Sequence, residues 1–170
     1  VPVSGLPASI FIPDTTRPEL LMVTLDLGIS ELMLTFTEAV DVSTINVTAI
    51  TLQSGPGTMS TMYTLTGGNV TGAASPIVNV TLAQSDVVAL MADPTLATES
   101  SNTYISFPRG VVLDYNGNPV VELSPEAPLQ VSSGTVNVSC SSLFVLYTFL
   151  LGMLRVAFCI ISLIKLTAYG

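Results

Sequence analysis

Short runs of β-forming residues separated by turn residues recur through most of this sequence, and they constrain its fold more than any other feature. Between residues 14 and 133, runs rich in Val, Ile, Thr, Leu and Tyr are broken by Gly, Pro, Asn or Asp about every ten residues. This spacing is typical of an antiparallel β-sandwich or barrel. It predicts strands over residues 19–26, 31–37, 45–53, 61–66, 68–73, 77–82, 103–107, 110–114, 119–123 and 127–132.

Alternation along these runs predicts which side chains face the core. In residues 31–37, Leu32, Leu34 and Phe36 alternate with Met33 and Thr35, so one face of this strand is apolar. The side chains expected to point inward are Leu32, Leu34, Phe36, Ile50, Leu52, Tyr63, Leu65, Val78, Val80, Tyr104 and Leu129.

Residues 85–93 (SDVVALMAD) interrupt the β pattern. Ser85 is a residue type that caps helix N-termini, and a short apolar stripe follows it. The segment therefore predicts a helix of one or two turns on a crossover between strands. The apolar stripe of this helix is formed by Val88, Leu90 and Met91.

Acidic residues in predicted loops are the candidates for metal binding. The segment 113–120 (LDYNGNPV) predicts a tight hairpin, because its Asn-Gly pair accepts positive φ. The spacing of Asn residues after Asp114 also resembles half of a calcium loop, but the bidentate acid that closes such a loop is missing, which favours a plain turn. Together with Asp14, Glu38 and Asp41, Asp114 lies in a predicted loop, and two of these acids could share a calcium ion at a domain junction. Solvated turn carboxylates are the alternative.

Charge and residue types exclude two classes of function. Only 9% of the residues are charged, against roughly 25% in an average soluble domain, and the mean hydropathy is +0.68. Four residues are Lys or Arg, which is too few for the positive patch that a nucleic-acid partner requires. The chain has no His, no Gly-rich phosphate loop and no nucleophile elbow, so we expect neither enzymatic activity nor an organic cofactor. Cys140 and Cys159 fall outside the predicted sandwich and lack metal-ligand spacing.

Four of the seven asparagines begin Asn-x-Ser/Thr sequons. This Ser and Thr content would produce about one or two sequons by chance. Two interpretations stay open: N-glycosylation in a secretory pathway, or the use of Asn-Val-Thr as ordinary strand sequence. Both place the asparagines on exposed strand or loop positions, and the four are Asn46, Asn69, Asn79 and Asn137.

The start of the chain resembles the closing segment of the predicted sandwich. With one gap, residues 1–10 (VPVSGLPASI) align with residues 121–131 (VELSPEAPLQV), as the repeats of a tandem array would. The sandwich over residues 14–133 already contains a closing strand. Residues 1–13 are therefore a surplus strand and linker, either the end of a preceding repeat or a donor strand.

This surplus segment is expected to pair with another domain. Residues 6–12, called the assembly strand below, are separated from the sandwich by a stiff, turn-rich stretch at residues 13–18. The side chains that form one aliphatic face of this strand are Leu6, Ala8, Ile10 and Ile12. We expect this face to extend the sheet of a preceding repeat or of a neighbouring copy, and a head-to-tail contact of this kind makes a fibre.

Residues 134–142 form a linker to a hydrophobic tail over residues 143–166. From residue 143 to residue 164 the tail carries one charge, Arg155, and as a helix it would be about 33 Å long, enough to cross a bilayer. Arg155 near the centre is costly in lipid. A membrane span, a processed lipid-anchor signal, a segment buried by neighbouring copies in a filament and an error in the sequence all stay open.

Three stretches carry a resemblance to a known family. DTTRPEL (14–20), LTFTEAV (34–40) and DYNGNPVV (114–121) resemble tandem immunoglobulin-like repeats of very large secreted or cell-surface proteins, of types found in bacteria, unicellular eukaryotes and early animals. The resemblance covers residues 1–133. It implies a β-sandwich used as an extracellular spacer, adhesive or structural module. The chain has no Trp and so lacks the Cys…Trp…Cys arrangement of antibody domains, and antibody-like receptor roles do not carry over.

These features predict an all-β, immunoglobulin-like antiparallel β-sandwich with one short crossover helix, followed by a hydrophobic segment. The expected function is that of a non-enzymatic structural subunit of an extracellular, glycosylated fibril, appendage or cell coat, with other copies or adjacent immunoglobulin-like repeats as partners. A membrane-anchored adhesion or recognition module is the alternative. No loop is enriched in the aromatic residues and Arg of binding hot spots, which favours the structural subunit.

Overall fold

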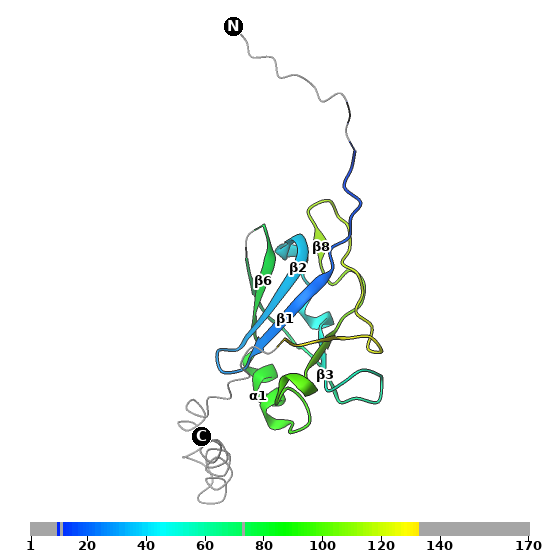
Figure 1. The fold of residues 1–170 in the computed structure, drawn as a ribbon. Coiled ribbons are helices and arrows are strands. Elements are labelled where there is room, and N and C mark those ends of the chain that lie inside the picture. Colours follow the sequence, from blue (N-terminus) through cyan, green and yellow to red (C-terminus); the bar gives the residue numbers. More distant parts are fainter. Residues whose placement is uncertain (1–9, 11, 73, 133–170) are drawn as a thin grey trace, which may run out of the picture. The chain divides into compact units, whose positions relative to one another are not determined.

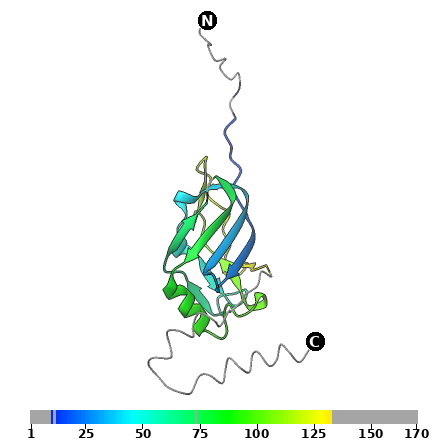
Figure 2. The same ribbon diagram turned by 90° about the vertical axis from the view of Figure 1, so that its left-hand side faces the viewer.

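Two antiparallel sheets share one core in the part of the chain that the computed structural model describes, residues 10, 12–72 and 74–132 (Figure 1). Sheet A has the strand order β1 (Leu20–Asp26), β2 (Glu31–Asp41), β6 (Ser75–Leu82) and β5 (Gly68–Thr71), and β8 (Leu113–Asp114) pairs with the end of β2. Sheet B has the order β4 (Met62–Thr64), β3 (Thr51–Gln53), β7 (Tyr104–Ser106) and β9 (Leu129–Gln130). The strands of sheet A lie side by side in Figure 2, from blue β1 to green β6. The predicted all-β class is confirmed.

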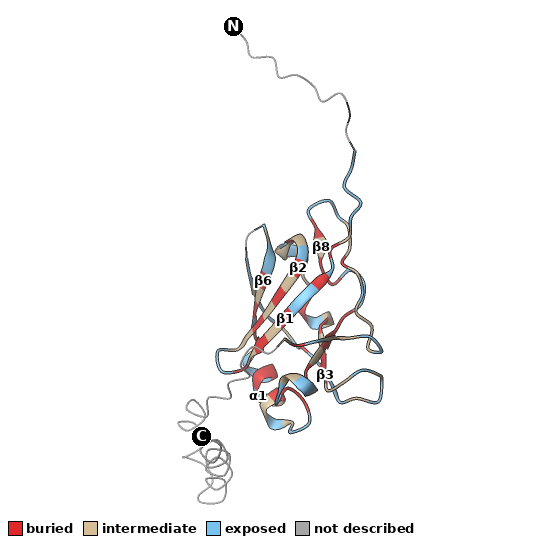
Figure 3. Ribbon diagram, viewed as in Figure 1, coloured by how far each residue is buried: buried red, intermediate tan, exposed pale blue. Residues whose placement is uncertain are grey.

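Burial alternates along the strands of sheet A and separates a core face from an outer face, as Figure 3 shows for β1. In β2, Leu32, Leu34 and Phe36 are buried, whereas Met33 and Thr35 are half-buried, which confirms the predicted register. The other predicted core residues that are buried are Ile50, Leu52, Leu65, Val78 and Val80. Tyr63 and Leu129 are half-buried and pack against this core.

The prediction that Tyr104 points into the core is wrong. In β7, Ile105 takes the inward position and lies opposite Leu52 of β3, and both side chains are fully buried. Phe107, two residues further on, is buried as well. Two large apolar side chains on one face outweigh a single Tyr, whose hydroxyl favours a partly exposed position.

The predicted strand over residues 45–53 is shortened at its start. Two 3₁₀ turns, η1 (Val42–Thr44) and η2 (Val47–Ala49), precede β3. Asp41 caps η1, because its Oδ1 accepts a hydrogen bond from the backbone N–H of Ser43 at 3.0 Å. Asp and Asn side chains offer the backbone such local bonds in place of a strand ladder, so the polar residues here favour turns.

The predicted strands over residues 110–114 and 119–123 reduce to β8 and two isolated bridges, Leu113 with Pro119 and Phe107 with Leu123. Pro119 lacks the N–H group that a longer ladder would need. The predicted tight turn between them is confirmed: Gly117 has a φ of 85°, and its N–H donates to the Asp114 carbonyl at 3.2 Å.

The predicted crossover helix is confirmed as α1 (Gln84–Ala92), and a 3₁₀ turn, η3 (Ser100–Asn102), lies between it and β7. Two details of the prediction are wrong. The N-cap is Ala83 rather than Ser85. In the predicted apolar stripe, Leu90 is buried and Met91 is half-buried and packs against the core, but Val88 is 56% exposed and Val87 faces inward in its place.

A buried carboxylate explains which face of α1 is directed toward the core. Asp86, in the first turn of α1, is fully buried. Its carboxylate accepts hydrogen bonds from the Tyr63 hydroxyl at 2.9 Å and from the backbone N–H and the hydroxyl of Thr66 at 2.9 and 2.6 Å. Burial alone would raise the pKa of Asp86, but these bonds and one from the Gly67 backbone hold it below its ordinary value. Because Asp86 is fixed inward, its neighbour Val87 faces the core in place of Val88.

Several predictions fall outside the described residues: Leu6, Ala8, Asn137, the linker over 134–142 and the tail over 143–166. Within the residues that are described, no helix is both long enough and apolar enough to cross a membrane.

Candidate functional site

The linker that precedes β1 is bound along the hairpin that carries β8 (Figure 1). Arg17 reaches two hairpin carbonyls with its guanidinium: Nε donates to Pro119 O at 2.9 Å and Nη2 to Val120 O at 3.0 Å. Beside this contact, the N–H of Val121 donates to Pro18 O at 2.9 Å. Hydrogen bonds from a charged guanidinium are stronger than neutral ones, so this contact fixes the end of the linker.

Two asparagine side chains extend this contact to the start of the linker. Asn116 Nδ2 donates to Asp14 Oδ2 at 3.3 Å, and Asn118 Nδ2 donates to Asp14 O at 3.2 Å. We call residues 14–18, with their hydrogen bonds to residues 114–121, the linker clamp. It orders a stretch of chain that lies outside both sheets.

Asp114 builds the hairpin side of the clamp. Its Oδ1 accepts hydrogen bonds from the backbone N–H groups of Asn116 at 2.8 Å and Asn118 at 2.7 Å, and its Oδ2 accepts one from Asn118 Nδ2 at 2.7 Å. Asp114 is buried, and burial alone would raise its pKa. The hydrogen bonds from Asn118, Asn116 and Gly117 nevertheless hold the pKa of Asp114 below its ordinary value, so this carboxylate stays charged.

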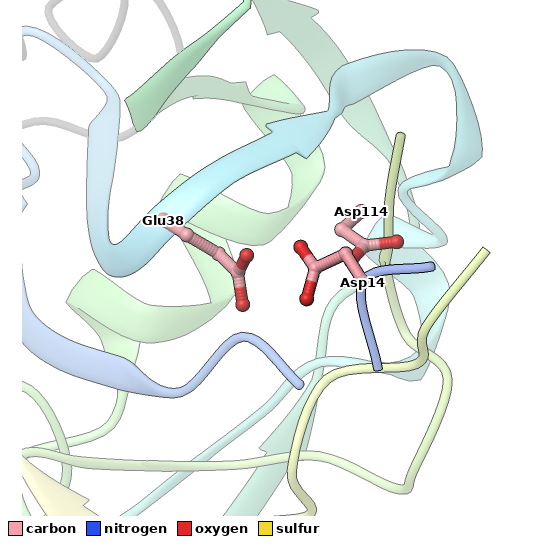
Figure 4. Close-up of side chains that lie close together, drawn as sticks. All are labelled: Asp14, Glu38 and Asp114. Atoms are coloured by element: carbon pink, nitrogen blue, oxygen red, sulfur yellow. The ribbon is translucent and has the colours of Figure 1, made fainter. Parts of the chain in front are cut away.

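Three carboxylates meet where the linker, β2 and the hairpin come together. Asp14, Glu38 and Asp114 each place a carboxylate oxygen within 4.8 Å of the others, and Figure 4 shows Glu38 directed toward Asp14. We call these three residues the acidic cluster. The prediction that Glu38 and Asp41 lie in loops is wrong, because both belong to β2. Glu38 lies between Thr35 and Val40, where the register of β2 on β6 is irregular. That irregularity frees Glu38 from the ladder and directs it toward the linker.

In the acidic cluster, Glu38 is the residue whose negative charge is destabilised by its surroundings. Its Oε1 is buried and has no hydrogen-bond partner among the residues that the structure describes. Burial raises the pKa of Glu38 above 4.5, and the negative charges of Asp14 and Asp114 raise it further. A proton or a cation near this oxygen would relieve both the missing partner and the repulsion.

Chemically, the cluster offers hard oxygen ligands. Carboxylates of this kind suit calcium, magnesium or manganese, and calcium accepts irregular sets of such ligands completed by backbone carbonyls and water. The structure brings together Asp14, Glu38 and Asp114, three of the four acids that the sequence offered as calcium candidates. Asp41 lies outside the cluster, because its carboxylate caps η1 and bonds the Ser43 hydroxyl at 2.7 Å.

The predicted glycosylation residues differ in exposure. Asn46, which caps η2, and Asn69, in β5, are exposed. Asn79, in β6, is half-buried, and its Oδ1 is buried without a hydrogen-bond partner in the described part of the chain. Asn137 lies outside the described residues.

Two residues of the assembly strand are described, and both are exposed: Ile10 by 77% and Ile12 by 83%. In the internal alignment Ile10 corresponds to Val131, which follows β9 and is only 2% exposed. Of the two aligned residues, Val131 is thus buried and Ile10 is exposed.

Sequence reasoning missed the residues of the clamp other than the acids, namely Arg17, Asn116 and Asn118, and it missed Asp86. One signal could have found Arg17. The chain has only four basic residues, and an isolated cation between two prolines in a linker indicates a specific partner. The two Asn residues were considered only for the turn and for half of a calcium loop, and their contacts with the linker were not predicted.

Comparisons of this chain with models of protein families, with curated proteins and with solved structures found no match.

Proposed function

We propose that this chain is a non-enzymatic, immunoglobulin-like structural module of an extracellular fibril, appendage or cell coat. It joins head to tail with another β-sandwich domain through its assembly strand, residues 6–12. That domain is the preceding repeat of a longer chain or a neighbouring copy.

The order of the strands supports the immunoglobulin-like assignment. Immunoglobulin domains place strands A, B, E and D in one sheet and C, F and G in the other. With β1 as A, β2 as B, β3 as C, β5 as D, β6 as E, β7 as F and β9 as G, sheet A has the order A-B-E-D and sheet B the order C-F-G, with β4 added beside C. The sandwich therefore has both its first and its last strand without any contribution from the assembly strand.

The linker clamp is the observation that carries the proposal. A free tether would let a preceding domain point in any direction, but hydrogen bonds from Arg17, Asn116, Asn118 and Val121 fix residues 14–18 on the hairpin. A module that transmits shape along a fibre needs a fixed linker of this kind. Burying Ile10 and Ile12 in the preceding repeat or the neighbouring copy would stabilise the contact by about 1.5–3 kcal/mol for each side chain.

Calcium at the acidic cluster would strengthen the same joint. Asp14 lies on the linker, whereas Glu38 and Asp114 belong to the sandwich. An ion that bound all three carboxylates would cross-link the linker to the domain and neutralise their repulsion. The joint would then be stiffer in calcium-rich surroundings, such as the outside of a cell.

The test compares assembly of the full chain with that of a variant lacking residues 1–13, by light scattering and electron microscopy. We expect polymers or larger particles from the full chain and monomers from the deletion variant. The double substitution Ile10→Ser/Ile12→Ser should have the effect of the deletion while keeping the chain length.

The matched control is Ile29→Ser, which removes an isoleucine that is 65% exposed in the turn between β1 and β2. It should leave assembly unchanged. Assembly that survives the deletion, or that is lost equally with Ile29→Ser, would contradict the proposal.

A further inference from the structure

Two of the glycosylation sequons pair with each other across the sheet. Asn69-Val70-Thr71 in β5 and Asn79-Val80-Thr81 in β6 run antiparallel, so that Asn69 lies opposite Thr81, and Thr71 lies opposite Asn79. The central valines also lie opposite each other, and the buried Val80 marks the core side. Alternation then places both asparagines and both threonines on the outer face of sheet A.

The two asparagines have different surroundings on that face. Among the described residues, β5 ends the strand order of sheet A, so Asn69 has one cross-strand neighbour there, Thr81. β6 is an inner strand, and Asn79 lies between Thr71 of β5 and Met33 of β2. Cross-strand neighbours stand close to each other. Asn69 is accordingly exposed, whereas Asn79 is half-buried with a shielded Oδ1.

We infer that Asn69, and not Asn79, carries the N-linked glycan of this pair, an inference that rests on the extracellular location in the proposed function. A glycan needs its amide nitrogen to project from the protein surface. Asn69 meets this condition at the edge of the sheet. At Asn79 the amide oxygen is buried, and paired strands flank the residue on both sides, which leaves less room for a sugar than at Asn69. The sequon at Asn79 thus serves as strand sequence.

A glycan at Asn69 would also protect the free edge of sheet A. Natural edge strands avoid pairing with other chains by carrying charges, proline or bulges. The residues of β5, Gly68–Thr71, include neither a charge nor a proline. A bulky hydrated sugar on this strand would block edge-to-edge pairing through β5, one of the two terminal strands of sheet A.

The test expresses the full chain in a eukaryotic secretory host and measures occupancy of each sequon in the folded, secreted protein by peptide mass spectrometry after enzymatic deglycosylation in heavy-oxygen water. Thr71→Ala destroys the Asn69 sequon, and Thr81→Ala destroys the Asn79 sequon, while both asparagines stay in place. We expect Thr71→Ala to lose the mass of one glycan and Thr81→Ala to lose none. Thr71→Ser and Thr81→Ser keep the sequons and control for the loss of the threonine methyl group.

The exposed Asn46 separates this inference from the proposed function. Glycan on Asn46 and Asn69 with Asn79 empty supports both. Glycan on Asn46 together with an occupied Asn79, or with an empty Asn69, overturns the inference but leaves the extracellular module standing. No glycan at any of the three overturns the inference together with the N-glycosylation that the sequons predict. If the edge role is correct, Thr71→Ala also self-associates more than Thr81→Ala in sedimentation velocity, and equal association refutes that role.

Discussion

Replacing Glu38 with glutamine removes one negative charge from the acidic cluster while keeping the length of the side chain. The carboxylate oxygens of the cluster lie within 4.8 Å of one another. Two unit charges at such a separation repel by about 0.9 kcal/mol at the dielectric constant of water, and by more at a lower one. Glu38 faces two such charges, so Glu38→Gln should raise the free energy of unfolding of the metal-free protein by about 1–2 kcal/mol at neutral pH and low salt.

The pH dependence of this gain follows from the raised pKa of Glu38. Because the folded state holds the proton of Glu38 more tightly than the unfolded state, the protonated group contributes stability that is fully present below pH 4.5. That contribution is lost as the pH rises from 4.5 through the raised pKa of the folded state. Glutamine does not titrate. The variant and the natural protein should therefore have similar stability below pH 4.5, and the advantage of the variant should grow above it.

Urea unfolding followed by circular dichroism, with a chelator and then with calcium, measures both effects. Calcium should reverse the order of stability, because an ion that binds only the folded state stabilises the protein that keeps its ligand. Glu126→Gln, at an exposed position outside the cluster, should change stability by less than about 0.5 kcal/mol. A metal-free Glu38→Gln protein that is less stable at pH 7, or a gain that does not depend on pH, would refute the electrostatic reasoning.

Three further predictions concern the core, the helix anchor and the clamp. Leu34→Ala should cost about 2–5 kcal/mol in the free energy of unfolding measured with urea, because Leu34 is only 2% exposed. Asp86→Ala should lower the free energy of unfolding by about 3–5 kcal/mol, because it leaves the buried donors of Tyr63 and Thr66 without an acceptor. The lowered pKa of Asp86 means that its stabilisation is complete above pH 3.8 and is lost as the pH falls through the folded-state value, which acid titration of the natural protein and the variant will compare. Arg17→Ala should leave the thermal unfolding of the sandwich within a few degrees of its original value but raise hydrogen exchange at residues 14–18.

The two-sheet class and the register of β2 could be predicted because alternation is clear where one face of a strand is buried. Leu32, Leu34 and Phe36 have polar or flexible neighbours, so the apolar face is unambiguous. Around β7 both faces carry large side chains, and Tyr104 competes with Ile105 for the inward position. The alternation of residue types alone does not decide which of these two side chains faces the core. The pairing of Ile105 with Leu52 of β3 decides it.

The acidic residues of the candidate site could be named from the sequence, but the contacts that bring them together could not. The acids Asp14, Glu38 and Asp114 come from the three stretches that carry the resemblance to immunoglobulin-like repeats, and these stretches meet in the structure. Their meeting depends on the irregular register of β2 and on hydrogen bonds of Asn116 and Asn118, which join residues about a hundred positions apart. Periodicity carries no information on contacts of this range. Asp41 was a reasonable candidate by type, but a local cap uses its carboxylate.

The central claim is that the assembly strand belongs to the sheet of another domain. Hydrogen exchange of backbone amides, followed by mass spectrometry of a peptide covering residues 6–12, tests it in the native assembled material and in the isolated chain. In the isolated chain we expect fast exchange, since Ile10 and Ile12 are exposed there. In the assembled material the same peptide should be protected as strongly as strands of the core, because its amides pair in a sheet. Equally fast exchange in both samples would contradict the claim.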